Sequence, residues 1–184
     1  MKKIVLSILT SFILLGVNAQ VTVDNTSQSV EQWVQNVLAG PGVIITNVEF
    51  NGSAADAQAP NEQVGSFTDV NSDVGLASGV ILGSGDVTLA EQTNSAASGS
   101  ASLGGTGNPG SDADLASITT ASIIDECVVE FDFVPAGDTI SFSYVFASEE
   151  YEEFVCSGFN DAFGFFLSGN NPLGGTFCET LCLK

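Results

Sequence analysis

Histidine is absent from this 184-residue chain, and basic residues are scarce. Without histidine, the chain lacks the most common general base, the most common zinc ligand and the usual physiological pH switch. Only three residues are basic, whereas 22 are acidic. Such a chain repels nucleic acid, because Lys and Arg are needed to neutralise phosphate, and it repels acidic lipid headgroups for the same reason. These shortages exclude nucleic-acid binding and histidine-dependent catalysis.

Long apolar stretches are also missing, except at the start of the chain. Two lysines precede an apolar run over residues 4–15, and small residues follow it, which is the order of a secretory signal peptide. A membrane anchor is the alternative, but the run is shorter than the roughly 20 residues that span a bilayer. We therefore predict a signal peptide over residues 1–19, cleaved between Ala19 and Gln20. The mature chain is then secreted or displayed on the outer cell surface, without direct membrane insertion.

Four cysteines are present in this chain with an export signal. In an oxidising compartment, disulfides are favoured over reactive thiols, and four cysteines allow three pairings. We favour Cys127 with Cys156, because one precedes the first strand of a predicted hairpin and the other follows the second. Closing a loop of this length would stabilise the fold by roughly 3 to 4 kcal/mol.

Most of the mature chain has the pattern of β-strands, with one helix near its start. Ser29 and Gln32 form a capping box, and apolar residues at helical spacing predict an amphipathic helix over residues 30–39. Apolar runs bounded by turn residues predict strands over residues 43–50, 64–67 and 79–82. Residues 92–117 are small and polar without an apolar period, which predicts a long loop.

The clearest strand signal lies further along the chain. Apolar residues alternate with polar ones over residues 129–133 and again over residues 140–146, and a turn sequence over residues 135–138 separates them. This pattern predicts an antiparallel hairpin. Residues 163–167 are apolar on both faces, as in a central strand. Together, these signals predict a mostly β fold: an antiparallel β-sandwich, jelly-roll-like, with one short N-terminal amphipathic helix.

Several motifs in this region resemble one protein family. They are Gly75–Leu82, Asp112–Leu115, Phe131–Pro135, Tyr144–Tyr151 and Phe159–Gly169. In this order and spacing, they resemble the choice-of-anchor L domain, a family of bacterial secreted or surface proteins with no assigned enzymatic activity. The resemblance implies a domain over residues 20–169 followed by an atypical tail over residues 170–184. Family members usually continue with further strands, so we expect an incomplete, C-terminally truncated domain.

Acidic side chains are concentrated at the end of the second hairpin strand and in the loop that follows. With two aspartates from the long loop, the candidate ligands are Glu149, Glu150, Glu152, Glu153, Asn160, Asp161, Asp112 and Asp114. Ca²⁺ takes six to eight oxygen ligands and would offset their mutual repulsion. The alternative is a solvated acidic rim. A second acidic segment, Asp69–Gly75, has its glycine at the wrong place for a calcium loop and is predicted to be a turn.

Two interpretations of function are open at this point. We favour a non-enzymatic module for adhesion, matrix or glycan binding, with an extracellular protein or polysaccharide as partner and Ca²⁺ as a structural ion. The alternative is a polysaccharide hydrolase that uses Glu149 or Glu150 with Asp161 as its carboxylate pair. Four aromatic residues could line a glycan site, although alternation favours a core position: Phe146, Tyr151, Phe154 and Phe159.

Overall fold

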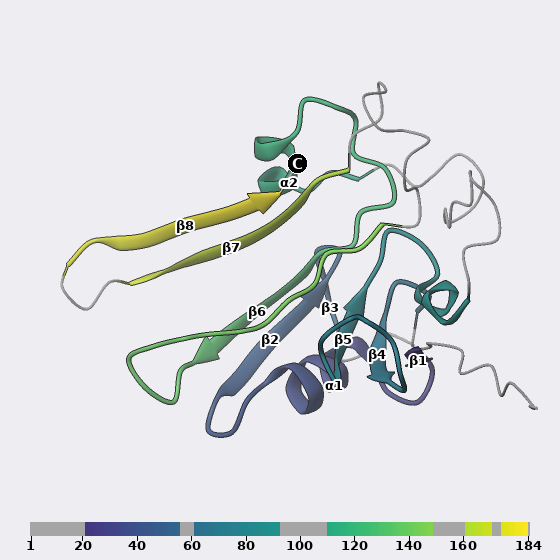
Figure 1. Ribbon diagram of the computed structural model, residues 1–184. Helices are drawn as coiled ribbons and strands as arrows, with labels where there is room; N and C mark the ends of the chain where they lie inside the picture. The colour runs from purple at the N-terminus through teal and green to yellow at the C-terminus, as the bar shows by residue number, and fades with distance from the viewer. Residues whose placement is uncertain (1–20, 56–60, 93–109, 149–160, 171–173, 184) are drawn as a thin grey trace, which may run out of the picture.

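The computed structural model describes residues 21–55, 61–92, 110–148, 161–170 and 174–183. The predicted signal peptide lies outside these residues. The protein is mostly β, and its described strands form three antiparallel sheets, two of three strands and one of two (Figure 1). The mostly β prediction is confirmed.

The first sheet contains the N-terminal strand of the described chain. Its order is β1–β4–β5, with bounds Val21–Asp24, Val64–Asp69 and Ser78–Leu82. The strands predicted over residues 64–67 and 79–82 are therefore confirmed. β1 and β4 approach closely at Gly65, where a Cβ atom would lie 2.6 Å from the carbonyl oxygen of Asp24. Only glycine fits at this position.

The second sheet has the order β3–β2–β6, with bounds Ser53–Ala54, Ile44–Phe50 and Val129–Val134. β2 confirms the strand predicted over residues 43–50. Its pairing with β6 is interrupted between Thr46 and Glu49, where Asn47 adopts a φ of 52°. The Asn47 side chain donates a 2.6 Å hydrogen bond to Asp132 Oδ2, so it links the two strands at the irregularity.

The predicted hairpin between residues 129–133 and 140–146 is wrong in its pairing. β6 forms as expected, but it pairs with β2, and residues 140–146 are not assigned to a strand. The reason is that alternation specifies which face of a strand is apolar and does not specify the neighbouring strand. β2 contributes Ile45, Val48 and Phe50 to the core, so the apolar side of β6 packs there.

Four short helical segments accompany the sheets within the described residues. They are α1 (Val30–Trp33), the π-helical η1 (Val34–Leu38), the 3₁₀-helical η2 (Val87–Glu91) and α2 (Ala113–Ile118). Ser29 Oγ accepts a hydrogen bond from the Gln32 backbone, and Gln32 Oε1 accepts one from the Ser29 backbone, which completes the capping box. α2 corrects the loop predicted over residues 92–117, because Asp112 caps a helix of six residues. A helix this short shows no apolar period in the sequence.

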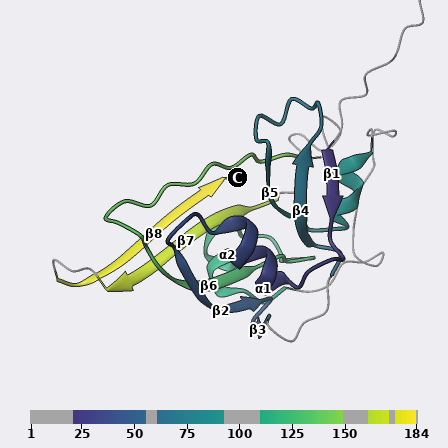
Figure 2. The same cartoon turned by 90° about the horizontal axis from the view of Figure 1, so that it is seen from below.

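The core lies where α1 and η1 meet both three-stranded sheets (Figure 2). α1 contacts β2 and β4, and η1 contacts β2 and β5. The buried residues of this cluster are Val30, Trp33, Val34, Ile45, Val48, Phe50, Ala55 and Val64. Trp33 is only 2% exposed. The short helical segment therefore joins the two sheets through one apolar cluster.

The third sheet is a two-stranded ribbon of β7 (Phe163–Asn170) and β8 (Thr176–Leu183), which projects from the rest of the molecule in Figure 1. β7 confirms a strand at residues 163–167, but its described partner is β8 alone. The tail expected over residues 170–184 contains β8. α2 packs on one face of the ribbon, where a Cβ atom at Gly164 would lie 3.2 Å from Ile118 Cδ1.

Candidate functional site

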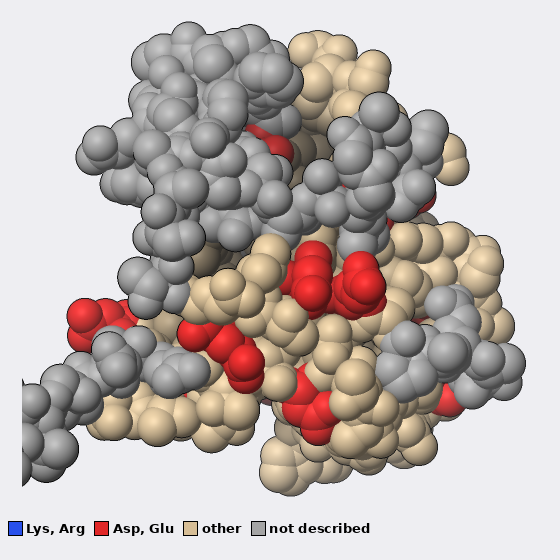
Figure 3. Space-filling model, turned by 90° about the vertical axis from the view of Figure 1, so that its right-hand side faces the viewer, with Lys and Arg blue, Asp and Glu red and all other residues tan. Residues whose placement is uncertain are grey.

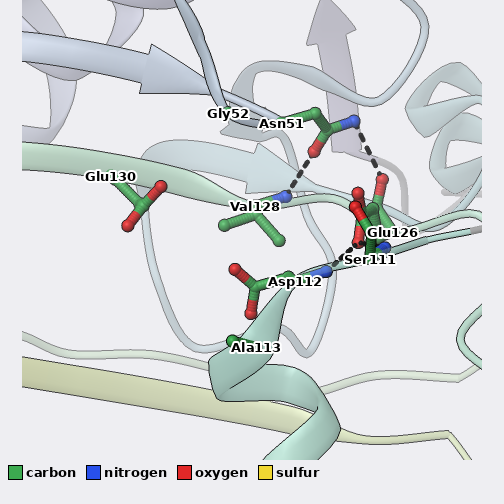
Figure 4. Close-up of a pocket in the computed structure, with 8 residues that line it drawn as sticks. All are labelled: Asn51, Gly52, Ser111, Asp112, Ala113, Glu126, Val128 and Glu130. Atoms are coloured by element: carbon green, nitrogen blue, oxygen red, sulfur yellow. Dashed lines mark hydrogen bonds between the residues drawn. The ribbon is translucent and has the colours of Figure 1, made fainter.

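An open hollow of about 220 Å³ lies between the β2–β3 turn, the start of α2 and β6 (Figure 4). Its lining residues are Asn51, Gly52, Ser111, Asp112, Ala113, Glu126, Val128 and Glu130. We call this the acidic hollow, because three of these side chains are carboxylates.

Two side chains hold the walls of the acidic hollow together. The Asn51 amide donates to the Glu126 carbonyl oxygen at 3.1 Å and accepts from the Val128 backbone at 2.8 Å. The Glu126 carboxylate accepts hydrogen bonds from the backbone nitrogens of Ser111 and Asp112, at 2.9 and 3.0 Å. The Glu126 carboxylate therefore fixes the chain just before α2. The Asp112 side chain caps α2 by accepting a hydrogen bond from the Leu115 backbone nitrogen.

The charge in and around the hollow is uncompensated. Partial burial raises the pKa of Glu130, and the neighbouring carboxylates of Asp112, Glu49 and Asp114 raise it further. The described residues include no Lys or Arg, and Figure 3 shows acidic side chains gathered on one face of the molecule. The repulsion at Glu130 would favour a nearby cation, but no group of three or more metal-ligating side chains in the described residues is arranged to hold one.

A second candidate surface is aromatic. Phe142, Tyr144 and Phe146 project from the extended segment after β6 and contact Phe163 and Phe165 of β7. We call these five residues the aromatic face. The shortest ring separation, between Phe142 and Phe165, is 4.4 Å, and the rings meet at 60°. Phe142, Tyr144 and Phe146 are 53%, 41% and 50% exposed, so the apolar surface is only half covered.

The predicted calcium ligands are only partly described. Asp112 and Asp114 lie at the start of α2, and Asp161 is exposed ahead of β7. The remaining predicted ligands are in residues 149–160, which lie outside the described residues. The same is true of Glu149 and Glu150, the predicted partners of Asp161 in the hydrolase interpretation. The structure instead brings Asp112 near Glu126 and Glu130. We did not predict this grouping, because its members come from separate segments and share no spacing motif.

The loop after β4 behaves as a turn. Asp69 Oδ1 accepts hydrogen bonds from the backbone nitrogens of Asn71 and Ser72, at 3.0 and 2.6 Å. These hydrogen bonds lower the pKa of Asp69, and the bonds from Ser72 contribute more than the bond from Asn71. The turn predicted for Asp69–Gly75 is confirmed, since its first carboxylate is used to close the loop.

Cys127 carries a free thiol in the structure. Its sulfur donates a 3.7 Å hydrogen bond to the Gln63 carbonyl oxygen, and burial raises the thiol pKa to about 12. A thiol with so high a pKa is a poor nucleophile. Cys156 lies outside the described residues, and the free Cys127 gives no support to the predicted bond between them.

The fold and its surfaces define a mostly β, strongly acidic module. Residues 22–178 match the sequence profile of the choice-of-anchor L domain, and the chain belongs to this family. The resemblance is therefore confirmed over most of the chain. Membership indicates a secreted or surface module of bacteria and is consistent with a non-catalytic role.

Other comparisons add nothing to this assignment. Neither the curated proteins nor the solved structures contain a match to the chain. None of the helices in the described ranges has the length and apolar character needed to cross a bilayer.

Proposed function

We propose that the protein is an exported, non-enzymatic surface module that adheres to an extracellular protein through its aromatic face. The observation that supports this proposal is the half-exposure of Phe142, Tyr144 and Phe146 on an uncharged strip of a strongly acidic chain. Exposed aromatic clusters are typical of binding surfaces, because they bury much area at a small cost in side-chain entropy. The family assignment to secreted and surface modules agrees with such a role.

The geometry of the rings favours a protein partner over a glycan. Phe142 and Tyr144 meet Phe165 edge to face, at 60° and 73°, whereas Tyr144 and Phe163 lie closer to parallel, at 28°. The rings of the aromatic face are therefore turned in different directions and do not share one flat plane. This packing resembles that of a hydrophobic core, and an apolar protein surface could complete it. The high negative charge also repels anionic polysaccharides. Phe146, expected in the core, is half-exposed, and the other three aromatic candidates lie outside the described residues.

Binding is tested with the mature chain, residues 20–184, and a panel of soluble extracellular proteins and of neutral and anionic polysaccharides. We expect Phe142→Ser to weaken binding to a protein by about tenfold or more, as for a central aromatic contact. Val145→Ser is the matched control, because Val145 is 50% exposed on the same segment and has no ring to contribute to the aromatic face. Equal loss in both variants, or binding to polysaccharides alone, would contradict the proposal.

We further propose that Ca²⁺ stabilises the domain through the acidic residues at 149–153, Asn160 and Asp161, with help from Asp112 and Asp114. The support is the density of carboxylates and the repulsion at Glu130, which a divalent cation would relieve. A ligand that binds only the folded state raises the melting temperature. We expect a higher midpoint in millimolar Ca²⁺ than in EDTA, and a smaller rise for Asp161→Asn. An unchanged melt would sink the calcium proposal and leave the adhesion proposal standing.

Export itself is also a proposal, and it has a direct test. After expression in a bacterium, the N-terminus of the protein outside the cell should be Gln20, as read by mass spectrometry. Replacing Ala19 with a bulky residue should block cleavage, because the processing site requires small side chains. A cytoplasmic, uncleaved product of the unchanged chain would overturn this assignment.

A further inference from the structure

We propose that Asn51 is a site of spontaneous deamidation whose rate is controlled by folding. Asn51 and Gly52 form the only Asn-Gly pair in the chain. They make the two-residue turn between β2 and β3, where Phe50 pairs with Ser53. Their φ angles are 47° and 70°, as in the type I′ turn that favours this pair.

The reaction needs only water as co-reactant. The backbone nitrogen of Gly52 attacks Cγ of Asn51, the bond from Cγ to the amide nitrogen breaks, and ammonia leaves. The five-membered cyclic imide then adds water and opens to aspartate or to isoaspartate, without oxidation or reduction. Glycine favours the attack, because it has no side chain to hinder its own nitrogen. Gly52 is unhindered from outside as well, since nothing lies within 4 Å of a Cβ built there.

The folded protein holds the Asn51 side chain away from this reaction. Its amide nitrogen donates to the Glu126 carbonyl oxygen at 3.1 Å, and its amide oxygen accepts from the Val128 backbone at 2.8 Å. Figure 4 shows these two bonds pointing toward the segment that leads into β6. The Asn51 backbone nitrogen also donates to the Val128 carbonyl, at 2.9 Å. Attack by Gly52 requires the side chain to turn back along its own chain, which breaks both side-chain bonds.

The partners of Asn51 are far away in sequence, which couples the reaction to folding. Glu126 and Val128 lie 75 and 77 residues beyond Asn51. The side chain is therefore restrained only while the segment before β6 is docked against β2. An unfolded chain, or one in which this segment has opened, leaves the amide free to react.

The product would oppose the return to the native structure. Aspartate at position 51 has no amide donor, so its carboxylate would face the carbonyl oxygen of Glu126 without a hydrogen bond. Isoaspartate would in addition lengthen the main chain of a two-residue turn. Either product adds a negative charge to the acidic hollow beside Asp112 and Glu126. Unfolding would thus become irreversible by chemical change at one residue.

The test compares two samples of the mature chain at the same mildly alkaline pH, one folded and one in urea. Peptide mapping by mass spectrometry then follows loss of the side-chain amide. We expect Asn51 to convert at least about tenfold faster in urea, which corresponds to about 1.4 kcal/mol of protection by the folded state. Asn47 is the internal control: it also has a positive φ and a side-chain hydrogen bond, but Val48 follows it. Asn47 should keep its amide in both samples.

Two results would overturn the proposal. Equal rates at Asn51 in both samples would show that folding does not control the reaction, and an intact Asn51 in urea would show that the site does not react. The effect of the product is measured separately with Asn51→Asp, which we expect to melt at a lower temperature than the unchanged chain. An unchanged melting temperature would overturn the inference that deamidation opposes refolding.

Discussion

Two regions of this protein use the same strand-forming residues with different results. In the body, built from β1 to β6 with α1 and η1, apolar residues from both sheets meet in one core. In the region from residue 134 onward, no side chain whose burial is described is buried. Both regions contain apolar strands, but in the described residues β7 is contacted only by α2, by β8 and by the aromatic segment after β6, and these contacts leave its side chains partly exposed. Strand pairing alone therefore does not make a core, and the half-exposed aromatic face is the surface that we propose for binding.

The largest expected effect is a loss of stability in the body that leaves the ribbon unchanged. Trp33→Ala should lower the free energy of unfolding by about 3 to 5 kcal/mol, because the indole is almost completely buried among the core residues. Phe142→Ala is the contrasting variant, since its ring is 53% exposed and should cost much less. Urea unfolding followed by circular dichroism measures both, because it does not depend on the single tryptophan. Equal losses would show that the two regions do not differ in this way.

Hydrogen exchange sharpens the same comparison without substitution. Amides of β2 and β6 should exchange at least about tenfold more slowly than amides of β7 and β8, because an isolated two-stranded ribbon is only marginally stable. α2 covers part of one face of the ribbon, so the β7 amides near Gly164 should be its best protected. Mass spectrometry of peptic fragments gives both values. Similar protection in the two sheets would mean that residues outside the described ranges stabilise the ribbon.

A smaller effect concerns the helix that joins the two sheets of the body. Ser29→Ala removes the side-chain acceptor of the capping box and should cost about 1 kcal/mol of stability. Ser29→Thr is the matched control, because threonine keeps the hydroxyl oxygen. The difference between the melting temperatures of the two variants measures the contribution of the cap. If Ser29→Ala melted like the unchanged chain, the cap would not contribute to joining the sheets.

The smallest expected effect is electrostatic and depends on pH. The pKa of Glu130 is raised in the folded state by burial and by neighbouring carboxylates, so its ionised form is disfavoured by folding. Its stabilising contribution is present below its ordinary pKa of 4.5 and is lost as the pH rises through the folded value. Glu130→Gln should therefore raise the melting temperature at neutral pH, and the gain should disappear at acidic pH.

Asp24 provides the control of opposite sign for Glu130. Hydrogen bonds from Ser27 and Thr26 lower the pKa of Asp24, so its ionised form is favoured by folding. Its contribution is present above the ordinary value of 3.8 and is lost as the pH falls through the folded value. Asp24→Asn should then lower the melting temperature at neutral pH only. If both variants changed the melting temperature at neutral pH in the same direction, the pKa shifts assigned to Glu130 and Asp24 would be contradicted.

Local features of the fold were predictable from the sequence, whereas its pairings were not. The capping box at Ser29 and the strands β2, β4 and β5 depend on neighbouring residues, so their signals are contained in short windows. The partner of β6 is β2, which lies about 80 residues earlier in the chain, and no short window of sequence contains that pairing. The Asn51-Gly52 pair between β2 and β3 is a local hairpin signal of the same kind.

The acidic hollow could not be predicted for a related reason. Asn51, Asp112 and Glu126 lie far apart in sequence, and only the docking of α2 and the segment before β6 against the β2–β3 turn brings them together. The acidic composition of their loop predicts Asp112 and Asp114 as calcium ligands. The cap that Asp112 forms on α2 follows a local rule, but the helix was too short to be recognised.

The pairing of β2 with β6 also sets a condition on how the chain can reach its native state. Ile44 pairs with Val134, so nearly the whole body has to be present before this sheet can close. A chain that emerges N-terminus first, from a ribosome or an export channel, exposes β2 and the residues of α1 for the time needed to deliver β6. Such long-range closure is slow compared with helix formation, and the waiting intermediate would be a target for chaperones.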